Sequence, residues 1–266
     1  MDVVTYPGGK NGAGVFQTII NLMPPHRVYI EPFLGGGAIM RLKRPAALNI
    51  GIDLDSAVIA RMRDAAGGIV SSGDAVPIVR KVGAGSHPQK RRAGPPHVKS
   101  GDTGDRARFQ FFNRNAFQFL YDYQFTGDEL VYCDPPYMHS TRTRRDLYQF
   151  EMTDAQHVEL LQIIRSLRCR VMISGYWTKL YAEKLSGWNS ATYQAVTRSG
   201  RVATEWLWFN FPEPVALHDY RFLGRNFRER ERIKRKKLRW ANRLRTMPVL
   251  ERRALMAALD LASPNA

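Results

Sequence analysis

A tetrapeptide that follows a short apolar run carries the groups best suited to chemistry in this chain. Residues 130–133 predict a buried strand, and Asp134-Pro135-Pro136-Tyr137 follows directly. The prolines fix their φ angles and lack N–H groups, so the turn is stiff and its carbonyl oxygens stay available. A carboxylate, a carbonyl and an aromatic ring in this order can hold a planar heterocycle that bears an exocyclic amine. The alternative is an ordinary turn that ends in a buried tyrosine.

A triple glycine and an acid suit a ligand that contains a nucleoside. Gly35-Gly36-Gly37 follows a strand predicted over residues 28–30 and precedes a predicted helix. Glycines at such a place let a ligand approach the backbone near a helix N-terminus. Asp53 ends the next predicted strand, where a carboxylate suits a ribose diol. Met40 at the third glycine position departs from the dinucleotide-binding fingerprint, and Asn11 after Lys10 departs from a phosphate-binding loop.

The N-terminal loop offers a third group. In Tyr6-Pro7-Gly8-Gly9-Lys10 a cation stands on a glycine loop and can hold a carboxylate, while the nearby ring can cover a cofactor. The alternative is a flexible tail, which is common at chain ends.

A strong positive charge predicts a polyanionic partner. The net charge is +16, and between Arg221 and Arg245 twelve basic residues face two acidic ones, a local excess of 12 − 2 = +10. This distribution predicts nucleic acid, and double-stranded DNA first of all. A smaller basic cluster lies mid-chain. The residues expected to contact DNA are Lys90, Arg91, Arg92, Arg228, Arg232, Lys236 and Arg239.

The elements that must position these residues predict an α/β fold. Strands and helices alternate up to about residue 185, which is typical of an α/β fold with a mostly parallel central sheet. Two strands over 191–196 and 204–211 predict an antiparallel hairpin at one edge. We therefore expect a catalytic domain over 1–218, with an irregular basic insert at about 67–107, and a basic helical extension over 219–266.

Apolar residues in the extension suggest that one helix side packs on the sheet while its basic side meets DNA. That predicted packing face comprises Leu238, Trp240, Leu244, Leu250, Leu255 and Leu259.

Composition excludes several other classes of protein. The two cysteines, Cys133 and Cys169, lie in apolar runs and form no disulfide framework or metal cluster. We expect no metal cofactor and a cytoplasmic, nucleoid-associated protein without a membrane span or signal peptide.

The three groups occur in the order typical of one enzyme family. Over about residues 5–211 the chain resembles the S-adenosylmethionine-dependent DNA adenine-N6 methyltransferases of the Dam type, and the combination is more specific than any single motif. The matching segments are Tyr6-Pro7-Gly8-Gly9-Lys10, Glu31-Pro32-Phe33-Leu34-Gly35-Gly36-Gly37-Ala38, Asp53, Asp134-Pro135-Pro136-Tyr137 and Ser174-Gly175-Tyr176.

The resemblance implies a Rossmann-like methyltransferase fold, a function, and a role for each matching residue. It implies transfer of a methyl group from S-adenosylmethionine to N6 of an adenine that has flipped out of DNA. Asp134 and the Pro135 carbonyl would accept hydrogen bonds from the target amine, Pro136 would stiffen the turn, and Tyr137 would stack on the base. The residues implied in cofactor binding are Tyr6, Lys10, Glu31, Pro32, Phe33, Gly35, Gly36, Gly37, Asp53, Asn115 and Asp134.

Departures from the family pattern leave alternatives open. Asn115 stands where the family often has an acid that meets the cofactor adenine, and Asp74 is a rival for that contact. The short segment between Asn115 and Asp134 leaves little room for a recognition region, which is then expected in the 76–108 insert or the extension. Three other assignments are methylation of cytosine at N4, methylation of RNA, and a catalytically silent nucleic-acid-binding protein. The target sequence, a cognate restriction endonuclease and a homodimer also stay open.

Overall fold

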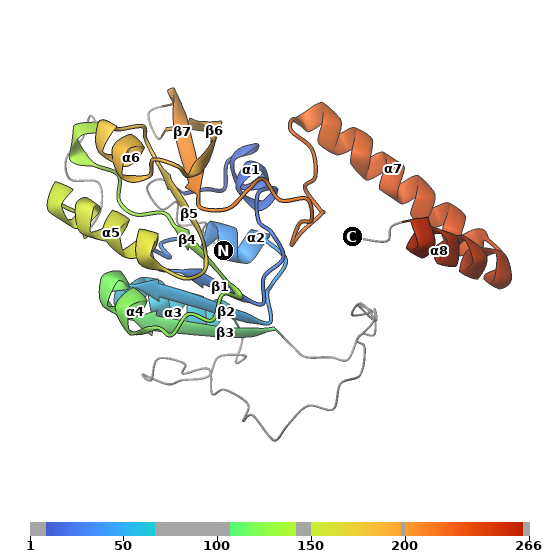
Figure 1. Ribbon diagram of the computed structural model, residues 1–266, viewed down its shortest axis with the longest axis horizontal. Helices are drawn as coiled ribbons and strands as arrows, with labels where there is room; N and C mark the ends of the chain where they lie inside the picture. Colours follow the sequence, from blue (N-terminus) through green and yellow to red (C-terminus); the bar gives the residue numbers. More distant parts are fainter. Residues whose placement is uncertain (1–8, 67–106, 142–149, 198–199, 263–266) are drawn as a thin grey trace, which may run out of the picture.

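A seven-stranded sheet forms the centre of the protein (Figure 1). The structure, a computed structural model, describes residues 9–66, 107–141, 150–197 and 200–262. The strand order is β3-β2-β1-β4-β5-β7-β6, with β7 antiparallel to both β5 and β6 and the other pairs parallel. The strands are β1 (Val28–Glu31), β2 (Leu48–Asp53), β3 (Arg108–Asn113), β4 (Glu129–Cys133), β5 (Arg170–Gly175), β6 (Asn189–Val196) and β7 (Val202–Phe209).

This sheet confirms the predicted fold class, including the antiparallel hairpin at one edge. Helices connect the strands and a helical pair ends the chain. The helices are α1 (Val15–Ile20), α2 (Ala38–Leu42), α3 (Ser56–Ala65), α4 (Ala116–Asp122), the 3-10 turn η1 (His139–Thr141), α5 (Asp154–Ser166), α6 (Lys179–Lys184), α7 (Phe227–Thr246) and α8 (Val249–Ala262).

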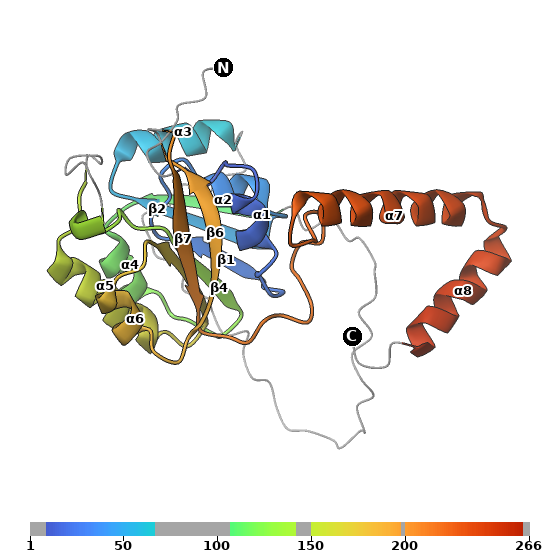
Figure 2. The ribbon, with the colours of Figure 1, turned by 90° about the horizontal axis from the view of Figure 1, so that it is seen from above.

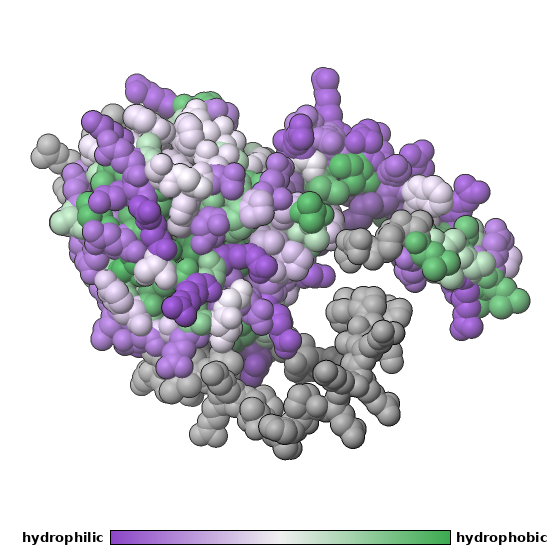
Figure 3. All heavy atoms as spheres, in the orientation of Figure 1, coloured by the Kyte–Doolittle hydropathy of each residue, from purple (hydrophilic) through white to green (hydrophobic). Residues whose placement is uncertain are grey.

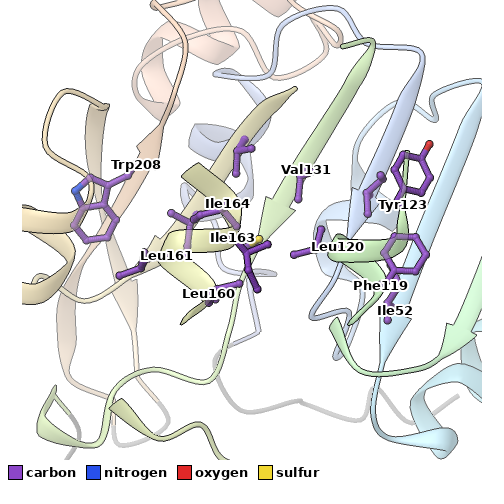
Figure 4. Packing of buried hydrophobic residues seen from close by; sticks show 14 of the residues in the cluster. Ile52, Phe119, Leu120, Tyr123, Val131, Leu160, Leu161, Ile163, Ile164 and Trp208 are labelled. Carbon is purple, nitrogen blue, oxygen red and sulfur yellow. The ribbon is translucent and has the colours of Figure 1, made fainter. Parts of the chain in front are cut away.

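Helices cover both faces of the sheet because its central strands are apolar on both sides. Along β4, Val131 and Cys133 pack toward α4, α5 and α6, while Leu130 and Tyr132 pack toward α1, α2 and α3. Figure 2 shows the two helical layers on opposite sides of the sheet. In Figure 4, Val131 lies between side chains of α4 and α5, all of them buried.

The sheet order creates a switch point between β1 and β4. From β1 the chain continues outward through β2 to β3, and β4 then adds on the other side of β1. Ligands of open α/β sheets bind outside the carboxyl ends of the strands at such a point. The Gly35–Gly37 loop follows β1 and the Asp134 turn follows β4, so topology brings the two predicted motifs together.

An anchor segment, residues 217–224, joins the extension to the catalytic part of the chain. His218 donates its backbone N–H to the carbonyl of Met23, and the carboxylate of Asp219 accepts from Arg44 N–H at 2.8 Å. The amide of Asn21 donates to the Phe222 carbonyl at 2.7 Å. These contacts tie the segment to the ends of α1 and α2, so 219–226 is not helical as predicted. Helix formation starts only at α7.

Beyond the anchor, α7 and α8 form an arm that extends away from the sheet (Figures 1 and 2). The predicted packing of its apolar side on the sheet is wrong: Leu238 is 56 % exposed and Leu250 is 80 % exposed. Hydrophilic and hydrophobic side chains both reach the surface of the arm (Figure 3). The apolar residues of α7, among them Ile233, Trp240 and Leu244, do lie over one arc of the helix at about 100° per residue, but this arc does not pack on the sheet: Trp240 is 51 % exposed.

Candidate active site

A single pocket brings the predicted glycine loop and the predicted catalytic turn together. Of the predicted cofactor residues that the structure describes, all line it, and Pro136 of the catalytic turn lies there too. Tyr6 and the rival Asp74 lie outside the described residues. The lining residues named by the sequence are Lys10, Glu31, Pro32, Phe33, Gly35, Gly36, Gly37, Asp53, Asn115, Asp134 and Pro136.

The glycine loop has a backbone shape that few other residues adopt. Gly35 and Gly37 have positive φ angles of 48° and 58°, and Gly37 caps the N-terminus of α2. A Cβ atom on Gly37 would lie 2.8 Å from the Met62 methyl group. The loop is held by Asp53, whose carboxylate accepts the Gly35 N–H at 2.7 Å and the Asp55 N–H at 2.8 Å. Backbone therefore faces the pocket without side chains in between.

Glu31 brings a buried carboxyl group to the pocket. It accepts hydrogen bonds from the Tyr29 hydroxyl at 3.0 Å and from the Met40 N–H at 3.2 Å. Burial raises the pKa of Glu31 to about 8. The group is therefore mostly protonated at neutral pH and can donate as well as accept a hydrogen bond.

Asn115 occupies the end of the pocket formed by α4. Its side-chain oxygen accepts the N–H groups of Phe117 at 2.8 Å and Gln118 at 3.2 Å, so it caps this helix. The local role of Asn115 is thus structural in part, and its contact with a cofactor stays a prediction.

Three polar groups lie close to one oxygen of Asp134. Its Oδ1 lies 2.8 Å from the Lys10 ammonium, 2.7 Å from the Ser174 hydroxyl and 3.3 Å from the Tyr137 hydroxyl. Burial raises the pKa of Asp134, the nearby ammonium lowers it, and a second carboxylate, Glu205, raises it further. The carboxylate is 19 % exposed and reaches the pocket. In the described part of the chain its hydrogen bonds all go to Oδ1, so Oδ2 is the oxygen best placed for a ligand.

Tyr137 is buried and its hydroxyl joins the same cluster. It accepts a hydrogen bond from the Lys10 ammonium at 2.7 Å and donates to Glu205 Oε2 at 2.7 Å. The Tyr176 ring contacts it edge-on, with centroids 4.8 Å apart. Tyr137 is 6 % exposed, and its stacking on a target base stays a prediction.

A comparison with protein families gives one match, over part of the chain. Residues 100–198 match the family model of the D12 class N6 adenine-specific DNA methyltransferases. The matched range runs through β4 and the turn after it, and it supports the predicted family over this part of the chain.

Solved structures of several methyltransferases are similar in part. The 23S rRNA methyltransferase ErmE is 12 % identical with a TM-score of 0.43, and the match covers 96 % of this chain and 89 % of that chain. A putative RNA methyltransferase from Pyrococcus horikoshii is 12 % identical with a TM-score of 0.42, covering 78 % and 88 %. A putative methylase from Haemophilus influenzae is 12 % identical with a TM-score of 0.39, covering 74 % and 84 %. No curated protein sequence matches the chain.

Sequence reasoning missed Glu205. This acid lies on β7 and its side chain is turned into the protein, where it is 5 % exposed. The signal that could have revealed it is an acid next to Trp206 in an otherwise apolar strand. An ionised carboxylate at such a place needs partners.

On α7 five arginines form a continuous arginine stripe. They follow the helical repeat at intervals of four, three, four and four residues, and all are exposed. They lie over one arc of the helix because each residue turns by about 100°. Of the predicted DNA contacts, three lie in the stripe, Lys236 lies beside it, and Lys90, Arg91 and Arg92 lie outside the described residues. The arginine stripe comprises Arg228, Arg232, Arg235, Arg239 and Arg243.

The opposite side of α7 turns toward the anchor segment. There Lys237 donates to the Tyr220 carbonyl at 3.2 Å, and Arg230 donates to the Gly224 carbonyl at 3.4 Å. The arginine stripe therefore points away from the root of the arm.

Within the described residues, neither a metal-binding group nor a membrane-spanning helix is present. These residues contain no group of three or more His, Cys, Asp or Glu side chains arranged to hold a metal ion. No helix in the described ranges combines the length and apolar character needed to cross a membrane.

Proposed function

We propose that this protein transfers a methyl group from S-adenosylmethionine to the N6 amine of an adenine in double-stranded DNA. One observation carries the proposal: Asp134 shares a pocket with the Gly35–Gly37 loop and Asp53. An acceptor for an amine thus lies beside a backbone surface suited to a nucleoside cofactor. The match to a family of N6 adenine-specific DNA methyltransferases supports the choice of base.

The residues around the pocket fit S-adenosylmethionine. The Gly35–Gly37 loop lines the pocket without side chains, so a nucleoside can approach its backbone closely. Asp53 offers oxygens to the ribose, and the protonated Glu31 can donate to an anionic group. Phe33 and Asn115 would border the cofactor adenine. When bound, S-adenosylmethionine supplies a methyl group activated by its sulfonium charge.

Asp134 and the turn after it would prepare the target amine. An aromatic amine is a weak nucleophile because its lone pair is delocalised into the ring. Acceptance of its hydrogens by Asp134 Oδ2 and the Pro135 carbonyl would localise that lone pair. Lys10 and Ser174 fix the orientation of the carboxylate through Oδ1. Positioning and fixed charges of this kind account for a large part of enzymatic rate enhancement. Asp134 would then take the proton that the methylated amine releases.

The target base must leave the DNA stack to reach Asp134. Extrusion costs a few kcal/mol, and stacking on an aromatic ring returns about 1–3 kcal/mol per base. We assign the stacking role to Tyr137, whose hydroxyl is held by Lys10 and Glu205.

The arginine stripe supports DNA as the partner. Five exposed guanidinium groups on one helix face offer contacts to phosphates. We therefore assign catalysis to residues 1–218 and DNA contact to residues 219–266.

Methylation of defined substrates by the variant Asp134→Ala tests the proposal. We expect loss of methyl transfer with S-adenosylmethionine binding retained, and we use Asp128→Ala, which removes an exposed acid, as the control. Mass spectrometry of nucleosides distinguishes N6-methyladenine from N4-methylcytosine, on DNA and on RNA. Methylation by Asp134→Ala equal to that of the wild type would refute the proposed role of Asp134. A wild-type protein without cofactor binding would instead be a silent nucleic-acid-binding protein.

A further inference from the structure

The buried acid of β7 lies beside the catalytic carboxylate without lining the pocket. Glu205 contacts the Lys10 ammonium at 3.4 Å and accepts from the Tyr137 hydroxyl at 2.7 Å, and both of these groups also contact Asp134. We propose that Glu205 is a positioning residue that keeps Asp134 able to accept the target amine. This inference rests on the proposed function of Asp134.

The first argument concerns the single proton of the Tyr137 hydroxyl. That proton can serve one acceptor at a time, and two carboxylates compete for it. The oxygen–oxygen distance is 2.7 Å to Glu205 and 3.3 Å to Asp134, so Glu205 takes the proton. If Glu205 were absent, the hydroxyl would turn to Asp134 and weaken that carboxylate as an acceptor.

The second argument concerns the charge of Lys10. The Lys10 side chain is 3 % exposed, and its ammonium is shared between Asp134 at 2.8 Å and Glu205 at 3.4 Å. Although burial lowers the pKa of Lys10, the two carboxylates raise it above its usual value, so the group stays charged. An ammonium with a second anionic partner neutralises Asp134 less completely. Glu205 therefore preserves the negative charge that the target amine meets.

The surroundings of Glu205 show that its orientation is fixed. Tyr193 on β6, its register partner, donates its hydroxyl to the same Oε2 atom at 3.0 Å. Three donors thus converge on one oxygen of a side chain that is 5 % exposed. A buried carboxylate that served packing alone would be costly without a polar function of this kind.

The substitution Glu205→Gln tests the proposal, because it keeps the shape and removes the charge. The pKa of Asp134 is read by NMR of carboxyl-labelled aspartate, assigned with Asp134→Ala, so the readout does not require turnover. We expect this pKa to fall, since one negative neighbour is lost and Lys10 pairs with Asp134 alone. In a plot of kcat against pH, the acidic limb should move to lower pH by the same amount as the pKa of Asp134.

Kinetic measurements complete the test. We expect kcat to fall at least tenfold in Glu205→Gln, while the Kd of S-adenosylmethionine stays within twofold of the wild type. Glu213→Gln, at an exposed position, is the matched control and should change neither quantity. Glu205→Asp keeps the charge and should leave the pKa of Asp134 near the wild-type value.

An unchanged pKa of Asp134 together with an unchanged kcat in Glu205→Gln would overturn the role of Glu205. If Glu205→Gln fails to fold, Glu205→Asp decides: a lowered pKa of Asp134 despite the retained charge overturns the proposal. A wild-type protein that methylates no nucleic acid would count against the proposed function, and the NMR measurement would still judge Glu205.

Discussion

The arginine stripe of α7 allows a quantitative prediction of DNA binding. Its five guanidinium groups span 15 residues, or about 22 Å at about 1.5 Å per residue. If each contacts one phosphate, the slope of log K against log salt is about −0.9 × 5, or about −4.5. Between 50 and 200 mM salt the affinity should then fall by about 500-fold.

Removing two members of the stripe should reduce this slope in a defined way. The double variant Arg232→Gln/Arg239→Gln should give a slope of about −2.7 and bind about 60-fold more weakly at 0.1 M salt. Arg232 has an ion pair with Glu229 at 3.7 Å, but both groups are on the surface, where such pairs contribute little. The control Lys234→Gln/Arg245→Gln removes the same charge from the other side of α7.

Fluorescence anisotropy with a labelled duplex measures both variants at several salt concentrations. The control should change the slope by less than about 0.5, because its two side chains face away from the stripe. If both variants lost the same affinity and the same part of the slope, net charge alone would attract DNA. A wild-type slope in Arg232→Gln/Arg239→Gln would refute the reasoning, since these arginines would then contact no phosphate.

Three further predictions follow from single contacts. Asp53→Ala removes the acceptor of the Gly35 N–H and should raise the Kd of S-adenosylmethionine at least about tenfold by calorimetry; an unchanged Kd would contradict a role for Asp53. Gly224→Ala places a Cβ atom 2.7 Å from Arg230 N at a φ of 134°, a strain of about 1–3 kcal/mol that should weaken duplex binding in the anisotropy assay but not cofactor binding. Burial lowers the pKa of His26 to about 2, so the unfolded state binds a proton below about pH 6.5 that the folded state does not. The free energy of unfolding should therefore fall as pH falls, by about 2 kcal/mol at pH 5. Urea unfolding of His26→Gln should not show this pH-dependent loss.

The fold class and the main motifs could be predicted because they depend on local patterns. Apolar runs separated by helices give a parallel sheet, and the glycines after β1 and the acid after β4 then meet at its switch point. The hairpin of β6 and β7 follows from alternation in the same way.

Other features depend on contacts between distant parts of the chain, which no local pattern contains. The Lys10 side chain points to Asp134 because Tyr137 and Glu205 surround it, and spacing does not indicate this. The position of the arm was missed because an apolar helix face does not indicate which surface it packs against. In α7 the apolar residues lie over one arc, yet Leu238 and Trp240 on this arc are exposed.

The cluster around Asp134 also has a consequence for the time at which the enzyme becomes competent during synthesis. Its members are far apart in the chain: Lys10 and Tyr137 are separated by 127 positions, and Tyr137 and Glu205 by 68. Contacts of such long sequence separation form slowly. A nascent chain that has completed β4 already contains Asp134 but still lacks β7, which must insert beside β5. Messenger truncation before β7 would therefore yield products with the cofactor loop and the catalytic turn, but without Glu205.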